Sequence, residues 1–420
     1  MNSIDNTIEA AVRNSTLTGV KSLDIEALSG GTSVAAGTAL ALTKSGQAGN
    51  NFAGGASASV NLIDKDVKAL AENNAVTGKS AAEKATVDVT AYESDLQVTG
   101  GVNADVAIGG GNAAGGSLTV ANINNNLEAG IHGGTYANIG ETQVQGLLAT
   151  KQISAAISAG VAVGSNGTDN AFTGAMLYNG LHNTVSADIS DGANITADSI
   201  AVKAHDTTSG STEAKAYENQ LATYRVKESL LQDAGIDTDG SSYYKTSDDN
   251  NGLDTAGEKV DFDGNKGSLS VGAAFVVAGS SGNAAGAAVN VANVDNDFTA
   301  ALADATLAAN SVSAEADADS LAVNVSAGVA AGSKDFGGMG SVTWQDMDNT
   351  VLAKASDSAI TADSLAVKAA SNSQAVNVAG SVPTARRQAL GPPWPTMAWT
   401  TTSTLTPVDG VFAVTLPPAR

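Results

Sequence analysis

One pattern returns along most of this chain and constrains its fold more than any other feature. It is an aliphatic residue, a polar stretch with asparagine at its centre, and alternating residues that end in alanine, as in Ile123 to Ala129. Five copies have asparagine at the anchor position and a sixth has lysine: Asn6, Lys65, Asn125, Asn183, Asn296 and Asn349. The spacings are 59, 60, 58, 113 and 53 residues. Such a long, fixed period is typical of a solenoid or propeller.

A second signature keeps the same phase and indicates β-strands. It runs from Ile195 to Ala204, has a close twin from Ile360 to Ala369, and has looser versions at Leu17 and Leu307. Apolar residues alternate with others at a period of two, which predicts short strands. Clusters of Gly and Asn between them, such as 109–112, predict turns because these residues tolerate positive φ.

The absence of proline from residues 1–382 favours one kind of solenoid. Each strand of a parallel β-helix pairs on both sides, so a residue without an N–H group breaks a ladder. The 77 alanines and 46 glycines, with only 4% aromatic residues, suit a narrow interior lined by small side chains. We therefore expect an all-β parallel β-helix. A compact coil holds roughly twenty residues, so we expect two or three coils per repeat and a rod of about 60–80 Å.

The anchor asparagines have two interpretations. Their side-chain amides stack along the coil axis and bond to one another, or they are turn residues in the left-handed region. Four aspartates also recur with the repeats: Asp198, Asp295, Asp348 and Asp363. Because repetition argues against a local active site, we interpret them as solvated charges that prevent lateral aggregation.

The doubled spacing has a visible cause in residues 205–265, which match no other part of the chain. They hold 13 acidic residues against five lysines and arginines, and their removal leaves a normal spacing of 52. Helical spacing of Tyr217, Leu221, Tyr224 and Leu231 predicts a helix at about 212–234. The loops after it offer carboxylate oxygens to calcium, although the EF-hand spacing is absent. The candidate ligands are Asp237, Asp239, Asp248, Asp249, Asp261 and Asp263.

The chain from residue 383 to 420 has a different composition. It contains all seven prolines, and we expect it to be a disordered, non-repeat tail. A one-base shift of a reading frame that encodes 394–403 can encode Val-Ala-Tyr-Asn-Gly-Met-Asp-Asn-Tyr-Phe, which follows the anchor pattern. We therefore expect a frameshift near residue 383. With the insertion and this tail set aside, residues 1–204 and 266–382 are expected to form the solenoid. Sequencing of intact genomic DNA tests this.

The anchored strands and the Ile-Thr-Ala-Asp-Ser-Leu-Ala-Val-Lys-Ala signature resemble the repeat region of Gram-negative filamentous adhesins, especially the leukotoxin-type family. The resemblance covers most of residues 1–382 outside the insertion. It implies a right-handed β-helix, export by a type V route and a place at the cell surface. We expect no signal peptide in this chain, whose first thirty residues lack a basic segment followed by an apolar one.

Composition and motifs narrow the function. The net charge of −22 repels nucleic acid and anionic membranes, and we expect no membrane insertion. There is no cysteine for disulfide or thiolate chemistry.

We expect a structural rod of an adhesin with no catalysis, no catalytic residues and no cofactor apart from the calcium candidate. Its partners would be host or bacterial surface receptors and neighbouring repeats. The alternatives are a β-helix carbohydrate-active enzyme, which needs a non-repeating carboxylate cluster, and a trimeric autotransporter head, which needs a repeat near fourteen residues.

Overall fold

The protein folds as an all-β solenoid of two facing parallel sheets. The computed structural model describes residues 1–44, 51–164, 169–207, 215, 217, 267–333 and 336–385. Sheet A contains β1 (Asn2–Arg13), β4 (Asn51–Glu72), β7 (Gly111–His132), β9 (Asn170–Ser190), β12 (Asn283–Ala303) and β14 (Gly337–Ser356). Sheet B contains β2 (Thr16–Val20), β3 (Ser22–Lys44), β5 (Ala75–Gly78), β6 (Ala85–Ile108), β8 (Thr135–Val163), β10 (Asn194–Asp206), β11 (Ser268–Ser280), β13 (Thr306–Gly332) and β15 (Ala359–Ala385). Among these residues, no helix is long and apolar enough to cross a bilayer.

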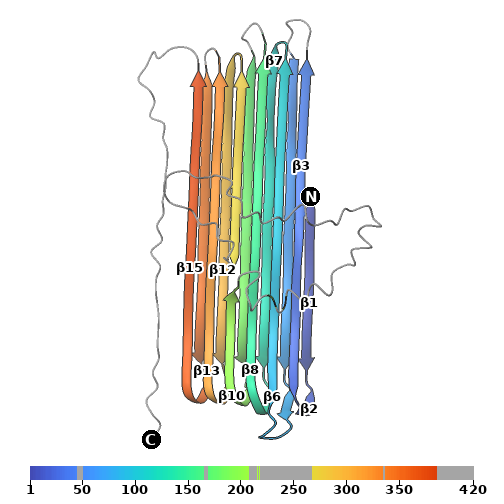
Figure 1. The fold of residues 1–420 in the computed structure, drawn as a ribbon, viewed down its shortest axis with the longest axis vertical. Coiled ribbons are helices and arrows are strands. Elements are labelled where there is room, and N and C mark those ends of the chain that lie inside the picture. The colour runs from blue at the N-terminus through green and yellow to red at the C-terminus, as the bar shows by residue number, and fades with distance from the viewer. Residues whose placement is uncertain are drawn as a thin grey trace, which may run out of the picture.

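Each sequence repeat forms one coil, so the expectation of two or three coils per repeat is wrong. The chain follows one strand of sheet A, turns, and returns along sheet B before the next strand of sheet A begins (Figure 1). The strands are also far longer than expected, with 22 residues in β7 and 29 in β8. The two facing sheets bury their inward side chains against each other, so the chain needs no third side to close the coil.

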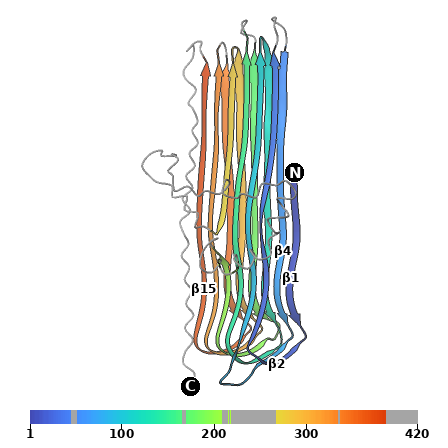
Figure 2. The same cartoon turned by 45° about the vertical axis from the view of Figure 1, so that its right-hand side comes forward.

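The molecule is a slab whose long dimension follows the strands (Figures 1 and 2). A strand of about 25 residues is about 80 Å long, whereas six strands at ~4.8 Å cover about 25 Å along the coil axis. The expected rod of 60–80 Å along the axis is therefore wrong. Its physical reason is that each repeat of more than fifty residues advances the axis by only one strand spacing.

The repeats stack without a shift in register. In sheet A, Asn6 pairs with Lys65, Lys65 with Asn125, and Asn125 with Asn183. Asn183 pairs with Asn296 and Asn296 with Asn349. In sheet B the second signature is in register too, because Ile195 pairs with Leu307 and Leu307 with Ile360. The six anchor positions therefore form one row across sheet A.

The insertion interrupts one strand of sheet B and leaves its register intact. Asp206 at the end of β10 pairs with Leu148, and Ser268 at the start of β11 pairs with Thr150. β10 thus extends two residues past the expected boundary at 204. The two strand segments lie in line against β8 and β13 on either side. The coil can therefore accept many residues at this point without a change in its neighbours.

The expected helix at 212–234 lies almost entirely outside the described residues, but Tyr217 is described. Its ring stacks on Tyr92 with a centroid distance of 5.3 Å, and it packs with Tyr92 and Leu147 in one buried cluster. Its hydroxyl accepts a hydrogen bond from Gln145. Tyr217 therefore docks on the outer face of sheet B.

The tail also lies outside the described residues, except at its start. β15 continues through Pro383 to Ala385, three residues beyond the expected boundary. β15 pairs only with β13, so it is an edge strand. A proline is tolerated there because one side of an edge strand carries no ladder.

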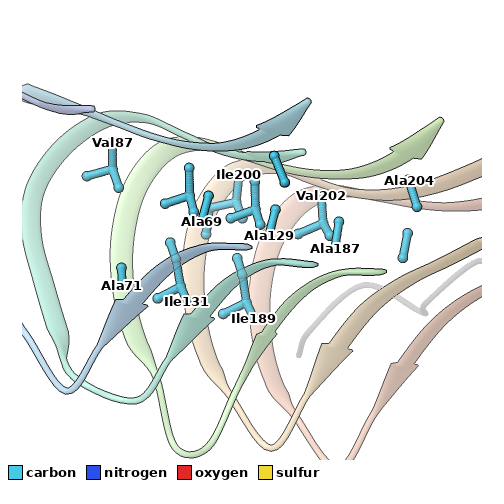
Figure 3. Packing of buried hydrophobic residues seen from close by; sticks show 14 of the residues in the cluster. Ala69, Ala71, Val87, Ala129, Ile131, Ala187, Ile189, Ile200, Val202 and Ala204 are labelled. Carbon is cyan, nitrogen blue, oxygen red and sulfur yellow. The ribbon is translucent and has the colours of Figure 1, made fainter. Parts of the chain in front are cut away.

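The main apolar core fills the half of the slab near the turns from sheet A to sheet B. Figure 3 shows Ala129, Ile131 and Ile189 of sheet A opposite Ile200 and Val202 of sheet B. Aliphatic residues of equivalent rows stack in successive coils, and their burial excludes water from this half. The other half has only small apolar clusters, separated by polar side chains.

Candidate functional site

The anchor asparagines form a continuous ladder of side-chain amides inside the solenoid. Nδ2 of Asn125 donates to Oδ1 of Asn183 at 3.2 Å, and Asn183 donates to Asn296 at 2.8 Å. Asn296 in turn donates to Asn349 at 2.7 Å. Asn6 occupies the same row in the first coil, where it is exposed. Asn183 and Asn296 each accept one bond and donate another along the axis, which fixes the register of the coils.

A row of hydroxyl groups on sheet B faces this ladder. The amide of Asn125 donates to Thr150 at 3.0 Å, that of Asn183 to Ser268 at 3.3 Å, and that of Asn349 to Ser320 at 3.0 Å. The hydroxyls therefore take the second hydrogen of the amides and tie the two sheets together. This facing row is a feature that the sequence analysis missed.

The interpretation of the anchors as turn residues is wrong, because all of them lie within strands of sheet A. The left-handed positions come eight residues later, after each strand has ended. They are Asn14, Asn73, Gly133, Asp191, Asp304 and Asp357, with φ between 47° and 70°. Asn, Asp and Gly are the residues that adopt this conformation most easily. A search for these three types at a constant offset from the anchors would have found the turn. The expected turn at 109–112 is confirmed for Gly109 to Gly111, which have positive φ.

Lys65 replaces asparagine in the ladder and forms a buried ionic cluster. Its side chain is 3% exposed, and Nζ lies 2.7 Å from Oε1 of Glu93 and 2.6 Å from Oδ1 of Asp95. Asp95 occupies the position that Thr150 has in the next coil, and Glu93 the position of Leu148. The ammonium group thus replaces the amide, and an acid replaces the facing hydroxyl. A lysine at the anchor with acids 28 and 30 residues later was the available signal.

Charge and burial oppose each other in this cluster. Burial raises the pKa of Glu93 to about 8, and the negative charge of Asp95 adds to the increase, while Lys65 opposes it. For Lys65, burial lowers the pKa, but Glu93 and Asp95 outweigh that effect and the net shift is upward. At neutral pH the buried Glu93 is therefore largely protonated, while Lys65 keeps its charge.

Away from the ladder, polar groups lie inside the half of the slab that is far from the turns between sheet A and sheet B. Asn103 and Asp105 point inward from β6 and are fully buried, with 2.5 Å between Asn103 Nδ2 and Asp105 Oδ2. Two glycines make room for them, because a Cβ on Gly115 would lie 1.7 Å from Asp105 and a Cβ on Gly55 would lie 2.9 Å from it. The interior here is thus a narrow polar seam.

The outer face of sheet A carries two of the four recurring acids, Asp295 and Asp348. Asp295 pairs with Asp348 on the next strand and with His182 on the previous one. A shallow hollow of about 440 Å³ opens over the same row. It is lined by Ser3, Ile4, Asp5, Leu62, Ile63, Asp64, Asn122, Asn124 and His182. Asn124 donates to Asp64 at 3.0 Å, so an amide hydrogen bond stabilises one carboxyl group of this row.

The other recurring acids belong to sheet B and lie apart from this row. Asp198 forms an ion pair with Lys84 of β6's approach loop, and both side chains are partly exposed. Asp363 lies in β15, two strands from β10 in sheet B. The four recurring acids are therefore not gathered into one site.

The outer face of sheet B is apolar over the half of the slab opposite the turns. Val34, Val98, Ile153, Val271, Val323 and Val376 form one row in register across six coils. Exposed aliphatic and aromatic residues continue along the same strands, including Ile157, Phe275 and Val329. The polar seam therefore lies inside and the apolar side chains lie outside, the reverse of the usual arrangement.

The six calcium candidates between Asp237 and Asp263 lie outside the described residues. Among the residues that are described, no three His, Asp or Glu side chains gather in a way that could hold a metal ion. Comparisons with protein-family models, curated proteins and solved structures found no match to this chain.

Proposed function

We propose that this chain is a segment of a large filamentous adhesin exported to the surface of a Gram-negative-type bacterium. It acts there as a structural rod that supports adhesion and performs no catalysis. Its partners are receptors on host or bacterial surfaces and the neighbouring repeats of the same protein.

The in-register stacking of one coil per repeat is the observation that carries the proposal. The anchor amides bond from coil to coil between Asn125 and Asn349. A solenoid of this kind is extended by the addition of repeats, because each coil contacts only its neighbours. The interior thus provides a rigid support, and the long outer faces are free for contact with other surfaces.

The insertion adds a second argument for a role in contact. Tyr217 anchors it to the outer face of sheet B, next to the exposed apolar rows. β10 and β11, on either side of the insertion, both keep their pairing with β8, so the insertion does not disturb the sheet. A segment placed in this way can carry recognition without a change in the support.

Adhesion of coated beads tests the proposal. Fluorescent beads carrying the full chain should bind cultured epithelial cells or other bacteria in a saturable manner, and free chain should compete. A matched control replaces Asn183 and Asn296 by leucine, which leaves every outer residue in place and breaks the interior ladder. Circular dichroism would show the loss of folded solenoid in this control, and we expect adhesion to fall with it.

A second variant without residues 205–265 separates the insertion from the coils. Binding that survives this deletion assigns the contact to the faces of the solenoid. Beads that bind no cell type, or that bind without saturation, would contradict adhesion. Release of unsaturated or reducing sugar ends from acidic polysaccharides by the purified chain would contradict a purely structural role.

A further inference from the structure

The outer half-face of sheet B is unusual for a surface in water. We define the apolar face as the outward residues of six strand segments, 34–42, 98–108, 153–163, 271–279, 323–331 and 376–382. All of these outward residues are Gly, Ala, Val, Ile, Leu or Phe, except Thr38. Many are widely exposed, such as Leu40 at 77% and Val277 at 49%, whereas Val323 is only 3% exposed. Patches of this kind on soluble proteins mark sites of association.

We propose that the apolar face is the interface with a second copy of this chain, packed sheet against sheet. Six strands at ~4.8 Å and about ten residues at ~3.3 Å give an area of about 1,000 Å². Stable protein interfaces bury about 800 Å² on each partner. The face is therefore large enough for a stable pair, and burial of its aliphatic side chains supplies the driving force.

The shape of the face selects a copy of the same chain as the occupant. The sheets show little twist, so the apolar face is nearly flat over its whole length (Figures 1 and 2). Its side chains lie in straight rows one strand spacing apart, because the strands are in register. A second copy presents rows of the same spacing, which can interdigitate as the facing sheets of a sandwich do, about 10 Å apart.

Charge argues against a lipid bilayer as the occupant. The chain has a net charge of −22, and the outward residues of the apolar face include no cation that could bind lipid phosphates. The acids on the outer face of sheet B lie in the half near the turns, for example Asp24, Glu26 and Asp88. In a face-to-face pair these acids stay at the margin and in water.

The corresponding half of sheet A is less suitable, because polar residues interrupt its outer face. Asn112, Asn170 and Asn283 form an outward amide row, with Asn170 donating to Asn112 at 2.8 Å and Asn283 to Asn170 at 3.0 Å. A pair through sheet A would bury these groups together with its apolar residues. Sheet A thus provides an internal control for the proposal.

Sedimentation of the full chain with matched lysine variants tests the interface. The wild type should sediment as a dimer of the 41.4 kDa chain. Ile153→Lys with Ile157→Lys, at sites 43% and 38% exposed on the apolar face, should yield a monomer. Leu118→Lys with Met176→Lys, at sites 40% and 52% exposed on sheet A, should leave the dimer intact. Circular dichroism confirms that both variants keep their β-structure.

Cysteine labelling gives a readout that does not depend on the lysine variants. The natural chain has no cysteine, so Ile157→Cys and Met176→Cys each introduce a unique thiol. Maleimide should react at least tenfold more slowly with Cys at 157 than at 176 in concentrated protein, and dilution should remove the difference. Equal rates at all concentrations would overturn the proposal.

Other outcomes would identify a different occupant. A monomeric wild type, or a dimer that survives Ile153→Lys with Ile157→Lys, would overturn the proposal, and the second result would indicate pairing through strand edges. Flotation of the wild type with phosphatidylcholine vesicles, lost in the same variant, would assign the face to lipid instead. None of these results depends on binding to cells, so the proposed adhesin function is tested separately.

Discussion

Replacement of Lys65 by asparagine should destabilise the protein, although asparagine is the usual residue of the row. The side chain is 3% exposed and bonds to Glu93 and Asp95 at 2.7 and 2.6 Å. Asparagine would restore the amide but leave the two acids buried without a cation. Removal of one partner from a buried ion pair costs about 3–5 kcal/mol, and we expect a loss of this size at pH 7.

The complete set of residues from the next coil should reverse this loss. Lys65→Asn, Glu93→Leu and Asp95→Thr together reproduce Asn125, Leu148 and Thr150, which occupy the equivalent positions. Exchange of a buried ionic cluster for well-packed neutral residues is often neutral or stabilising by about 1–4 kcal/mol. We therefore expect the triple variant to be at least as stable as the wild type.

Urea unfolding followed by circular dichroism measures both variants. Because a solenoid can lose coils separately, hydrogen exchange of peptides from residues 60–100 should accompany it, with residues 340–370 as the distant reference. The single variant should lose protection in the first region and keep it in the second. A single variant as stable as the wild type, or a triple variant as unstable as the single, would refute the reasoning.

Three further predictions concern the same interior. Because the pKa of Glu93 is raised, its contribution to the free energy of unfolding is full below about pH 4 and falls as the pH rises to about 8, by on the order of 1 kcal/mol per pH unit. Glu93→Gln should flatten this slope in urea titrations at pH 5 to 9. Burial also raises the pKa of Asp206, but that group contributes equally to both proteins. Asn183→Ala should lower the free energy of unfolding in urea by about 3 kcal/mol, because it removes three buried hydrogen bonds. Asn170→Ala in the outer amide row should lower it by under about 1 kcal/mol. Equal losses in the two variants would show that the ladder does not stabilise the interior. Gly115→Ala should lower the free energy of unfolding by about 1–3 kcal/mol, because its methyl group would lie 1.7 Å from Asp105. Gly100→Ala, whose methyl group would meet open space, is the control. An unchanged free energy of unfolding in Gly115→Ala would show that the seam is loosely packed.

Sequence reasoning could identify the ladder because the anchors keep their phase. The spacing placed Asn125, Asn183 and Asn296 in one row, and the structure bonds them to one another. It also noted Lys65 in the same place, but it could not find the partners. Glu93 and Asp95 lie on the other sheet, and the pairing across the interior depends on where the chain turns.

The number of strands in a coil could not be read from the repeat. A glycine cluster such as 109–111 ends a strand, but Gly54 and Gly55 lie within β4 and Gly100 and Gly101 within β6. The difference is one of surroundings, since Gly55 makes space for the side chains of β6. Local sequence therefore suggested short strands where the structure has long ones.

The sequence by itself determined a parallel solenoid with an asparagine row and an interruption at one position. It did so because in-register stacking brings equal residues together, and repetition is visible without coordinates. Only the tertiary structure decided that the coil has two long sides and that its polar seam faces inward. A period of two divides a strand into two faces, but it does not say which face is buried. That choice depends on the tertiary structure, because in the half of the slab that holds the seam most of the space between the two sheets is filled by small and hydrogen-bonded side chains.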